Sequence, residues 1–112
     1  MATVNQTQLV APMQLANADA AVFTCPTLTT AKISRAVFTN TSASAVTISA
    51  GITTGGALTT ATTMISARSL APGEAYVSPE LAGAVLPAGS ALHAYASAAT
   101  AVTFTASGLT IV

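Results

Sequence analysis

The side chains that could perform chemistry are few and lie far apart in the sequence. Cys25 and His93 are the only cysteine and histidine, and the only side-chain carboxylates are those of Asp19, Glu74 and Glu80. A thiol activated by an imidazole would give a nucleophile, but Cys25 lies in an apolar run, where a buried inert thiol is the usual outcome. Two carboxylates flanking a substrate could act as acid and base, but turns and prolines separate these three. We therefore predict no catalytic residue and no enzymatic activity.

Metal ions and cofactors are not predicted either. One cysteine and one histidine cannot assemble a cysteine-based zinc site. Residues 51–56 are rich in glycine but lack the Lys-Ser/Thr pair with which a phosphate loop reaches phosphates and Mg²⁺. We predict a flexible surface loop over residues 51–63 and a structural or interface role for His93. No cofactor, metal site or small-molecule substrate is expected.

The scarcity of charge is the most informative property of the composition. Three basic and three acidic residues make up 5% of the 112 positions, and the formal net charge is zero. A soluble surface usually contains about 25–35% charged residues. Three scattered cations give no basic patch for nucleic acid or for an anionic membrane surface, so neither partner is expected. The composition favours a domain whose surface is covered by neighbouring subunits.

Arg35 and Arg68 each lie within an apolar, strand-like segment. One interpretation is that their guanidinium groups extend to a strand edge while the aliphatic stems cover apolar surface. The other is that they make charge-assisted hydrogen bonds to a neighbouring subunit. On the second interpretation, both arginines are interface residues.

The elements that must position these residues are short strands. Segments rich in Val, Ile, Thr and Phe alternate with turn signals, such as the Pro-Gly pair at residues 72–73, at intervals of roughly ten residues. The only plausible helical segment, residues 80–85, is short and contains a glycine. About eight strands at this spacing predict an all-β, single-domain β-sandwich with jelly-roll or another Greek-key topology.

The segment around the first arginine shows the strand pattern most clearly. Residues 32–40 alternate, which predicts that Ile33 and Arg35 share one face and that Phe38 lies on the other. A polar turn over residues 40–44 and a return strand of β-branched residues follow. This combination predicts a hairpin.

Residues 1–18 differ from the rest of the chain and are predicted to form an extended N-terminal arm that precedes a sandwich domain at residues 19–112. Pro12 argues against a regular central strand or a helix interior in this segment. A frayed terminus is the alternative, although a solvated tail would not need so many apolar residues. We expect the arm to pack on a neighbouring subunit through four apolar side chains: Val4, Leu9, Val10 and Met13.

The turn chemistry resembles that of a widespread group of small virion proteins of tailed bacteriophages. The matching elements are a strand and turn at residues 32–48, an L-x-P-G-E turn at 70–74, a P-E-L-x-G step at 79–83 and an L-P-A-G turn at 86–89. The resemblance extends over about residues 20–108 and leaves the N-terminal arm outside it. It implies a jelly-roll cement or decoration protein that sits on the outside of a capsid shell.

By this resemblance, the chain binds the major capsid protein as a homo-oligomer, either a dimer or a trimer. It would be located on the exterior of the virion after assembly in the host cytoplasm, and the N-terminus shows no secretory signal. Apolar burial and β-augmentation would stabilise contacts between capsid subunits. The alternative is a neck, tail or fibre-associated adaptor. A second alternative is a carbohydrate-binding β-sandwich module, for which Tyr76 and Tyr95 are the aromatic candidates.

Overall fold

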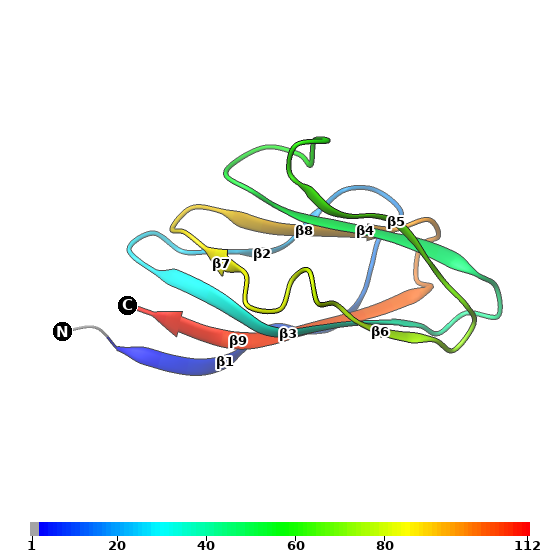
Figure 1. The fold of residues 1–112 in the computed structure, drawn as a ribbon, viewed down its shortest axis with the longest axis horizontal. Helices are drawn as coiled ribbons and strands as arrows, with labels where there is room; N and C mark the ends of the chain where they lie inside the picture. Colours follow the sequence, from blue (N-terminus) through cyan, green and yellow to red (C-terminus); the bar gives the residue numbers. More distant parts are fainter. Residues whose placement is uncertain (1–2) are drawn as a thin grey trace.

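The chain folds into two β-sheets packed face to face. The computed structural model describes residues 3–112, and this range contains nine strands. Sheet A has the strand order β1-β9-β3-β6, with β7 also paired to β3, and sheet B has the order β2-β8-β4-β5. Figure 1 shows sheet A as the lower layer and sheet B as the upper layer. The strands are β1 (Val4–Gln14), β2 (Ala21–Thr24), β3 (Thr30–Asn40), β4 (Val46–Thr53), β5 (Thr63–Leu70), β6 (Ala75–Val77), β7 (Val85–Leu86), β8 (Ala91–Ala96) and β9 (Val102–Ile111).

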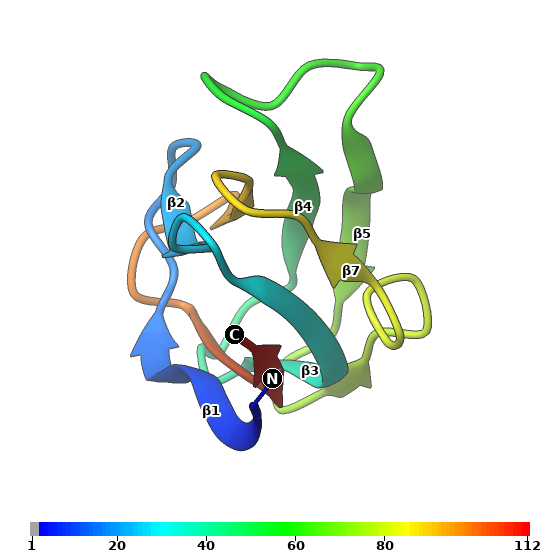
Figure 2. The same cartoon turned by 90° about the vertical axis from the view of Figure 1, so that its left-hand side faces the viewer.

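The strand pairing is that of a jelly roll. The first strand pairs with the last strand, and the second strand pairs with the last but one. The antiparallel pairs are β1 with β9, β2 with β8, β3 with β6 and β7, and β4 with β5. Every connection crosses from one sheet to the other except β4–β5 and β6–β7, and the end-on view in Figure 2 shows the chain wrapping around the core. This topology confirms the predicted all-β sandwich. Strands β6 and β7 lie one after the other beside β3, which explains the ninth strand.

The core between the sheets is thin and largely aliphatic. Phe38 and Phe104 are its largest fully buried side chains, and their ring centroids lie 4.6 Å apart. Seven of the 21 buried apolar residues are alanines, and each alanine removes little apolar surface from water. Side-chain burial therefore stabilises the fold only modestly. Close approach of the backbones and hydrogen bonds at the corners between the sheets matter more for its stability.

Strand β3 contains one extra residue that changes which side chains face the core. Two consecutive residues of β9 pair with Ile33 and Arg35, so Ser34 has no partner and forms a β-bulge. Ile33 and Phe38 are both buried, although they are five positions apart, and Arg35 is exposed. The prediction that Ile33 and Arg35 share a face is therefore wrong, because the bulge reverses the alternation.

Two glycines within strands mark places where backbones approach closely. A Cβ atom on Gly108 of β9 would lie 1.9 Å from the carbonyl oxygen of Lys32 at the β3 bulge. A Cβ on Gly51 would lie 2.1 Å from the carbonyl oxygen of Thr62 and 2.7 Å from Cδ2 of Leu58. The β4–β5 loop therefore packs against the outer face of sheet B, above the upper layer in Figure 1. The predicted loop begins later than expected, because Gly51 belongs to β4.

The turn after β3 leads from one sheet to the other. Because β3 belongs to sheet A and β4 to sheet B, the predicted hairpin is wrong. The buried side chain of Asn40 explains the course of the chain, since its Nδ2 donates to the carbonyls of Ser44 at 2.8 Å and Leu70 at 3.1 Å. Its Oδ1 accepts from the backbone amide and the hydroxyl of Ser42, at 2.9 and 2.7 Å. Leu70 ends β5, so this one side chain fixes a corner of the sandwich.

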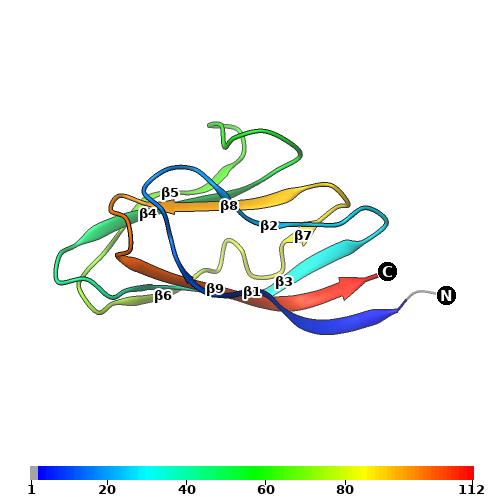
Figure 3. The same ribbon diagram turned by 180° about the vertical axis from the view of Figure 1, so that it is seen from behind.

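Residues 4–14 of the predicted arm form β1, the edge strand of sheet A seen from behind in Figure 3. This strand pairs with β9 over almost its whole length, with register shifts on either side of Val10. Beyond it, Thr3 and Val112 exchange two backbone hydrogen bonds of 2.9 Å each. Pro12 is tolerated because the strand lies at an edge. Residues 4–14 thus belong to the sheet, and residues 1 and 2 lie outside the described residues.

The segment at residues 80–85 forms a turn that leads into β7. Its first turn is closed by the Ser78 hydroxyl, which accepts a hydrogen bond from the Leu81 amide at 3.1 Å. In the part of the chain that the structure describes, no helix is long and apolar enough to cross a membrane.

Candidate functional site

The side chains that could take part in a reaction make structural contacts within the chain. Cys25 is buried just after β2, and its thiol donates to the carbonyl of Thr29 at 3.2 Å. Glu74 lies in the turn before β6, where its Oε1 accepts from the amide of Ala71 at 2.7 Å. Among residues 3–112, no group of three His, Cys, Asp or Glu side chains could hold a metal ion.

His93 and Asp19 together hold the β4–β5 loop on sheet B. The Nδ1 of His93 on β8 lies 2.9 Å from Oδ1 of Asp19, and Oδ2 of Asp19 accepts from the Leu58 amide at 2.9 Å. Burial raises the pKa of Asp19, but the hydrogen bond from Leu58 and the proximity of His93 outweigh it, so this pKa lies below its ordinary value of 3.8. The carboxylate form therefore joins three segments that are distant in sequence. This arrangement supports the structural role predicted for His93.

A pH titration of the Leu58 amide tests this contact. Ionised Asp19 contributes stability above pH 3.8, and this contribution is lost as the pH falls through the lowered pKa of the folded state. We expect the Leu58 amide proton resonance to shift with a midpoint below 3.8 and the transition to disappear in Asp19→Ala. Two-dimensional ¹⁵N NMR measures both, with Asn17→Ala as the control. A midpoint at or above 3.8, or a transition that persists in Asp19→Ala, would contradict the contact.

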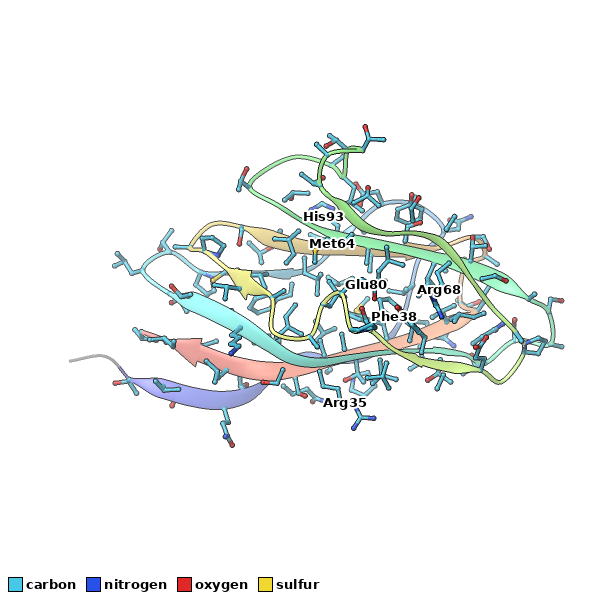
Figure 4. All side chains as sticks on the ribbon, viewed as in Figure 1. Arg35, Phe38, Met64, Arg68, Glu80 and His93 are labelled. Carbon is cyan, nitrogen blue, oxygen red and sulfur yellow. The ribbon has the colours of Figure 1, made fainter. Side chains whose placement is uncertain are left out.

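Arg68 joins the two sheets at their open edge (Figure 4). Its guanidinium carbon lies 3.9 Å from the centre of the Tyr76 ring on β6, which is a cation–π contact. The Tyr76 hydroxyl donates to Oε1 of Glu80, and Ser78 donates to the same atom at 3.2 Å. The bond from Tyr76 is the main reason why the pKa of Glu80 lies below its ordinary value of 4.5, against the smaller opposing effect of burial. A β-bulge at Ala67, whose φ is 49°, precedes the arginine and places it here.

These contacts bear on the interface role predicted for Arg68 and on the tyrosines proposed for carbohydrate binding. Arg68 contacts its own chain, so the interface role predicted for it is not needed to explain its position. The Tyr76 ring is covered on one face by that guanidinium, and Tyr95 is half-buried on β8. Carbohydrate sites commonly use exposed aromatic faces, and neither tyrosine offers a fully open ring.

Arg35 points away from the sandwich on the outer face of sheet A (Figure 4). No carboxylate of residues 3–112 lies within ion-pair distance of it. Both arginines are exposed, but only Arg68 of the two lies over an aromatic ring of its own chain.

The four apolar residues predicted as an interface divide into two pairs. Val10 is 4% exposed and Leu9 is half-buried, so both pack into their own chain. Val4 is 58% exposed and Met13 is 38% exposed. Of these four residues, Val4 and Met13 are therefore the two that leave apolar surface exposed on β1.

The outer edge of β1 is the longest unpaired strand edge in the described part of the chain. Thr3 and Val112 exchange backbone hydrogen bonds, and the alternation of an antiparallel ladder then directs the N–H and C=O groups of Val4 and Gln6 away from β9. The strand contains no charged residue, although charges are the usual protection of an exposed edge. These backbone groups are therefore free to bond to another strand.

Sequence reasoning did not single out Ser34, Asn40 or Gly108. A signal for the bulge was present, because Ile33 and Phe38 are apolar at an odd spacing, and a regular strand cannot bury both. A glycine inside a strand pattern signals a bulge or a close backbone approach. The Asn-Thr-Ser sequence at residues 40–42 has the chemistry of an Asx turn.

Comparison with known proteins establishes the fold. No protein-family model matches the chain, and no curated protein matches it. A structure of the Gx strain of infectious bursal disease virus is similar with a TM-score of 0.56 and 17% identity, over 99% of this chain and 32% of that one. The VP2 subviral particle of the same virus gives 0.55 and 17%, over 98% and 32%, and its T13 viral particle gives 0.56 and 10%, over 98% and 30%.

The chain thus spans less than a third of the length of each of these proteins. At 10–17% identity, the likeness is one of fold. The chain has an all-β sandwich fold that is also present in proteins of a viral particle.

Proposed function

We propose that this chain is a non-enzymatic structural protein of a virus particle, a decoration or cement protein on the exterior of the capsid. The observation that supports this most directly is the long, uncharged and unpaired edge of β1 on a domain with only 5% charged residues. The fold shared with proteins of a viral particle adds support. The turn motifs at residues 70–74, 79–83 and 86–89 favour tailed bacteriophages as the source.

In this proposal, the chain forms a homo-oligomer through β1. Two copies of β1 pair antiparallel about a two-fold axis, and sheet A continues from one copy into the other. The free backbone groups of Val4 and Gln6 supply hydrogen bonds, and the exposed side chains of Val4 and Met13 supply apolar area. A dimer presents two identical capsid-binding surfaces, which raises its effective affinity for a shell of repeated major capsid protein subunits.

Copy number tests the function. We expect quantitative mass spectrometry of purified virions to find on the order of hundreds of copies per particle, since closed shells repeat their surface contacts by symmetry. Electron cryo-microscopy of the same particles should place the chain on the outer surface of the head. About a dozen copies or fewer would instead support the neck, tail or fibre adaptor. Absence from the particle would refute both assignments.

A substitution on the free edge tests the oligomer. Gln6→Pro removes one outward N–H group without removing a bond to β9, and proline is compatible with an edge position. We expect self-association to weaken about tenfold, measured by analytical ultracentrifugation. Gln6→Thr retains the N–H group and serves as the matched control.

Val4→Lys provides an independent check, because a charge at an edge opposes strand pairing. Its dimer should dissociate most readily at low salt, while circular dichroism reports whether either variant has lost the fold. A wild-type monomer at high concentration would refute the edge contact. So would a trimer that is insensitive to these substitutions.

A further inference from the structure

The outer face of sheet A holds two of the three cations of the chain. In a regular strand, Lys32 and Arg35 would point to opposite faces, because three positions separate them. Ser34 is the extra residue of the β3 bulge, and both flanking cations are therefore exposed on the same outer face. This placement depends on the bulge.

A groove lies on this sheet, and Lys32 and Arg35 are each paired with a residue that lines it. Its volume is about 270 Å³, and it crosses β1, β9 and β3. Lys32 pairs with Leu109, and Arg35 pairs with Ser107, so the cations stand beside residues of the groove. The pairing of β1 with β9 also shifts register opposite Ser107, between Thr7 and Val10, and bulges commonly reshape a sheet next to functional sites. The groove is lined by Gln6, Thr7, Ser34, Ser107, Gly108 and Leu109.

The polar groups around the groove are available to a ligand. Within residues 3–112, the side chains of Gln6, Thr7, Ser34 and Ser107 form no hydrogen bond to another residue. The three side-chain carboxylates of the protein are engaged elsewhere, Asp19 by Leu58, Glu74 by Ala71, and Glu80 by Tyr76. The positive charge of this face is therefore not compensated by the chain itself.

We propose that this groove binds an acidic side chain of a partner protein. The fork of N–H groups on Arg35 matches the two oxygens of a carboxylate, Lys32 adds a second charge, and the hydroxyl and amide groups of the groove donate further hydrogen bonds. A second copy of this chain is a poor occupant, because its own side-chain carboxylates are already bonded. Two cations are too few for nucleic acid. The inference rests on the proposed function, in which the partner is a capsid subunit.

Peptide titration of the ¹⁵N-labelled full chain tests the site. The probe is blocked tetraglutamate, and blocked tetraglutamine is the neutral control. We expect tetraglutamate alone to shift the amide resonances at residues 6–7, 34 and 107–109, with an affinity that falls as salt is added. Lys32→Gln and Arg35→Gln should each weaken binding about tenfold. Arg68→Gln is the matched control and should leave binding unchanged, because Arg68 lies on the Tyr76 ring.

Several outcomes would overturn the assignment. These are shifts spread evenly over the surface, equal binding of tetraglutamine, or equal weakening by Arg68→Gln. Tighter binding of inorganic phosphate at the same residues would also overturn it, because the groove would then be a small-anion site. Particle binding separates this inference from the proposed function. If the double variant Lys32→Gln/Arg35→Gln occupies virions as fully as wild type, the groove assignment fails while the decoration role stands. If the wild type itself is absent from virions, the decoration role fails while the groove assignment stands on the peptide titration.

Discussion

Replacing Gly108 with alanine is expected to destabilise the sandwich by about 3 kcal/mol or more. The added Cβ would lie 1.9 Å from the carbonyl oxygen of Lys32 and 3.1 Å from Cα of Ile33. Both neighbours are backbone atoms of β3, and β9 is held on its other side by β1, so the clash can be relieved only by separating strands. The φ of Gly108 lies outside the left-handed region, and the cost therefore arises from the contact alone.

Chemical denaturation monitored by circular dichroism measures this effect. Ser107→Ala is the matched control, since it changes the exposed neighbour on the same strand and should alter stability by less than about 0.5 kcal/mol. A Gly108→Ala protein as stable as the control would show that β3 and β9 are not so close at the bulge. The groove on the outer face would then lose its structural basis.

Replacing Asn40 with aspartate is expected to cost about 4 kcal/mol at neutral pH. The amide donates to the carbonyls of Ser44 and Leu70, and a carboxylate can donate to neither. The substitution would place a buried negative charge against two carbonyl oxygens, while only the contacts from Ser42 would persist. The corner between the sheets would lose the group that closes it.

The pH dependence of the Asn40→Asp variant is diagnostic. Burial against carbonyls favours the protonated form of the introduced carboxyl and raises its pKa in the folded state. The stability deficit relative to wild type should therefore grow as the pH rises through that pKa and shrink in acid, where the protonated group can donate one hydrogen bond. Thermal unfolding at several pH values measures it, with the exposed Asn17→Asp as the matched control. A pH-independent deficit would contradict this account.

The sequence predicts the all-β architecture well because turn signals and short β-branched segments limit the length of each strand, whichever strand it pairs with. Residues 72–73 and 87–89 end strands as expected. Pairing partners cannot be predicted in the same way. The polar turn at residues 40–44 suits a hairpin and a sheet-to-sheet corner equally, and only the long-range bond from Asn40 to Leu70 decides between them.

The candidate surfaces are predictable only in part. Arg35 is singled out from the sequence as an interface candidate, but Lys32, which is exposed on the same face, is missed, because strict alternation assigns the two to opposite faces. Val10 is apolar enough for an interface, yet the register shifts around it turn it into the core. Arg68 is strand-borne as predicted, and the aromatic group that covers it comes from the other sheet. In each case, a bulge or a contact between sheets determines the outcome.

The pairing of β1 with β9 has a consequence for biosynthesis. Strand β9 lies between β1 and β3, so sheet A cannot be completed until residues near position 111 have left the ribosome. Contacts of such long sequence separation slow folding. The unfinished chain exposes aggregation-prone strands, and its few charges provide little repulsion between molecules. The interval in which these strands are exposed therefore lasts until β9 has been synthesised and has paired with β1 and β3.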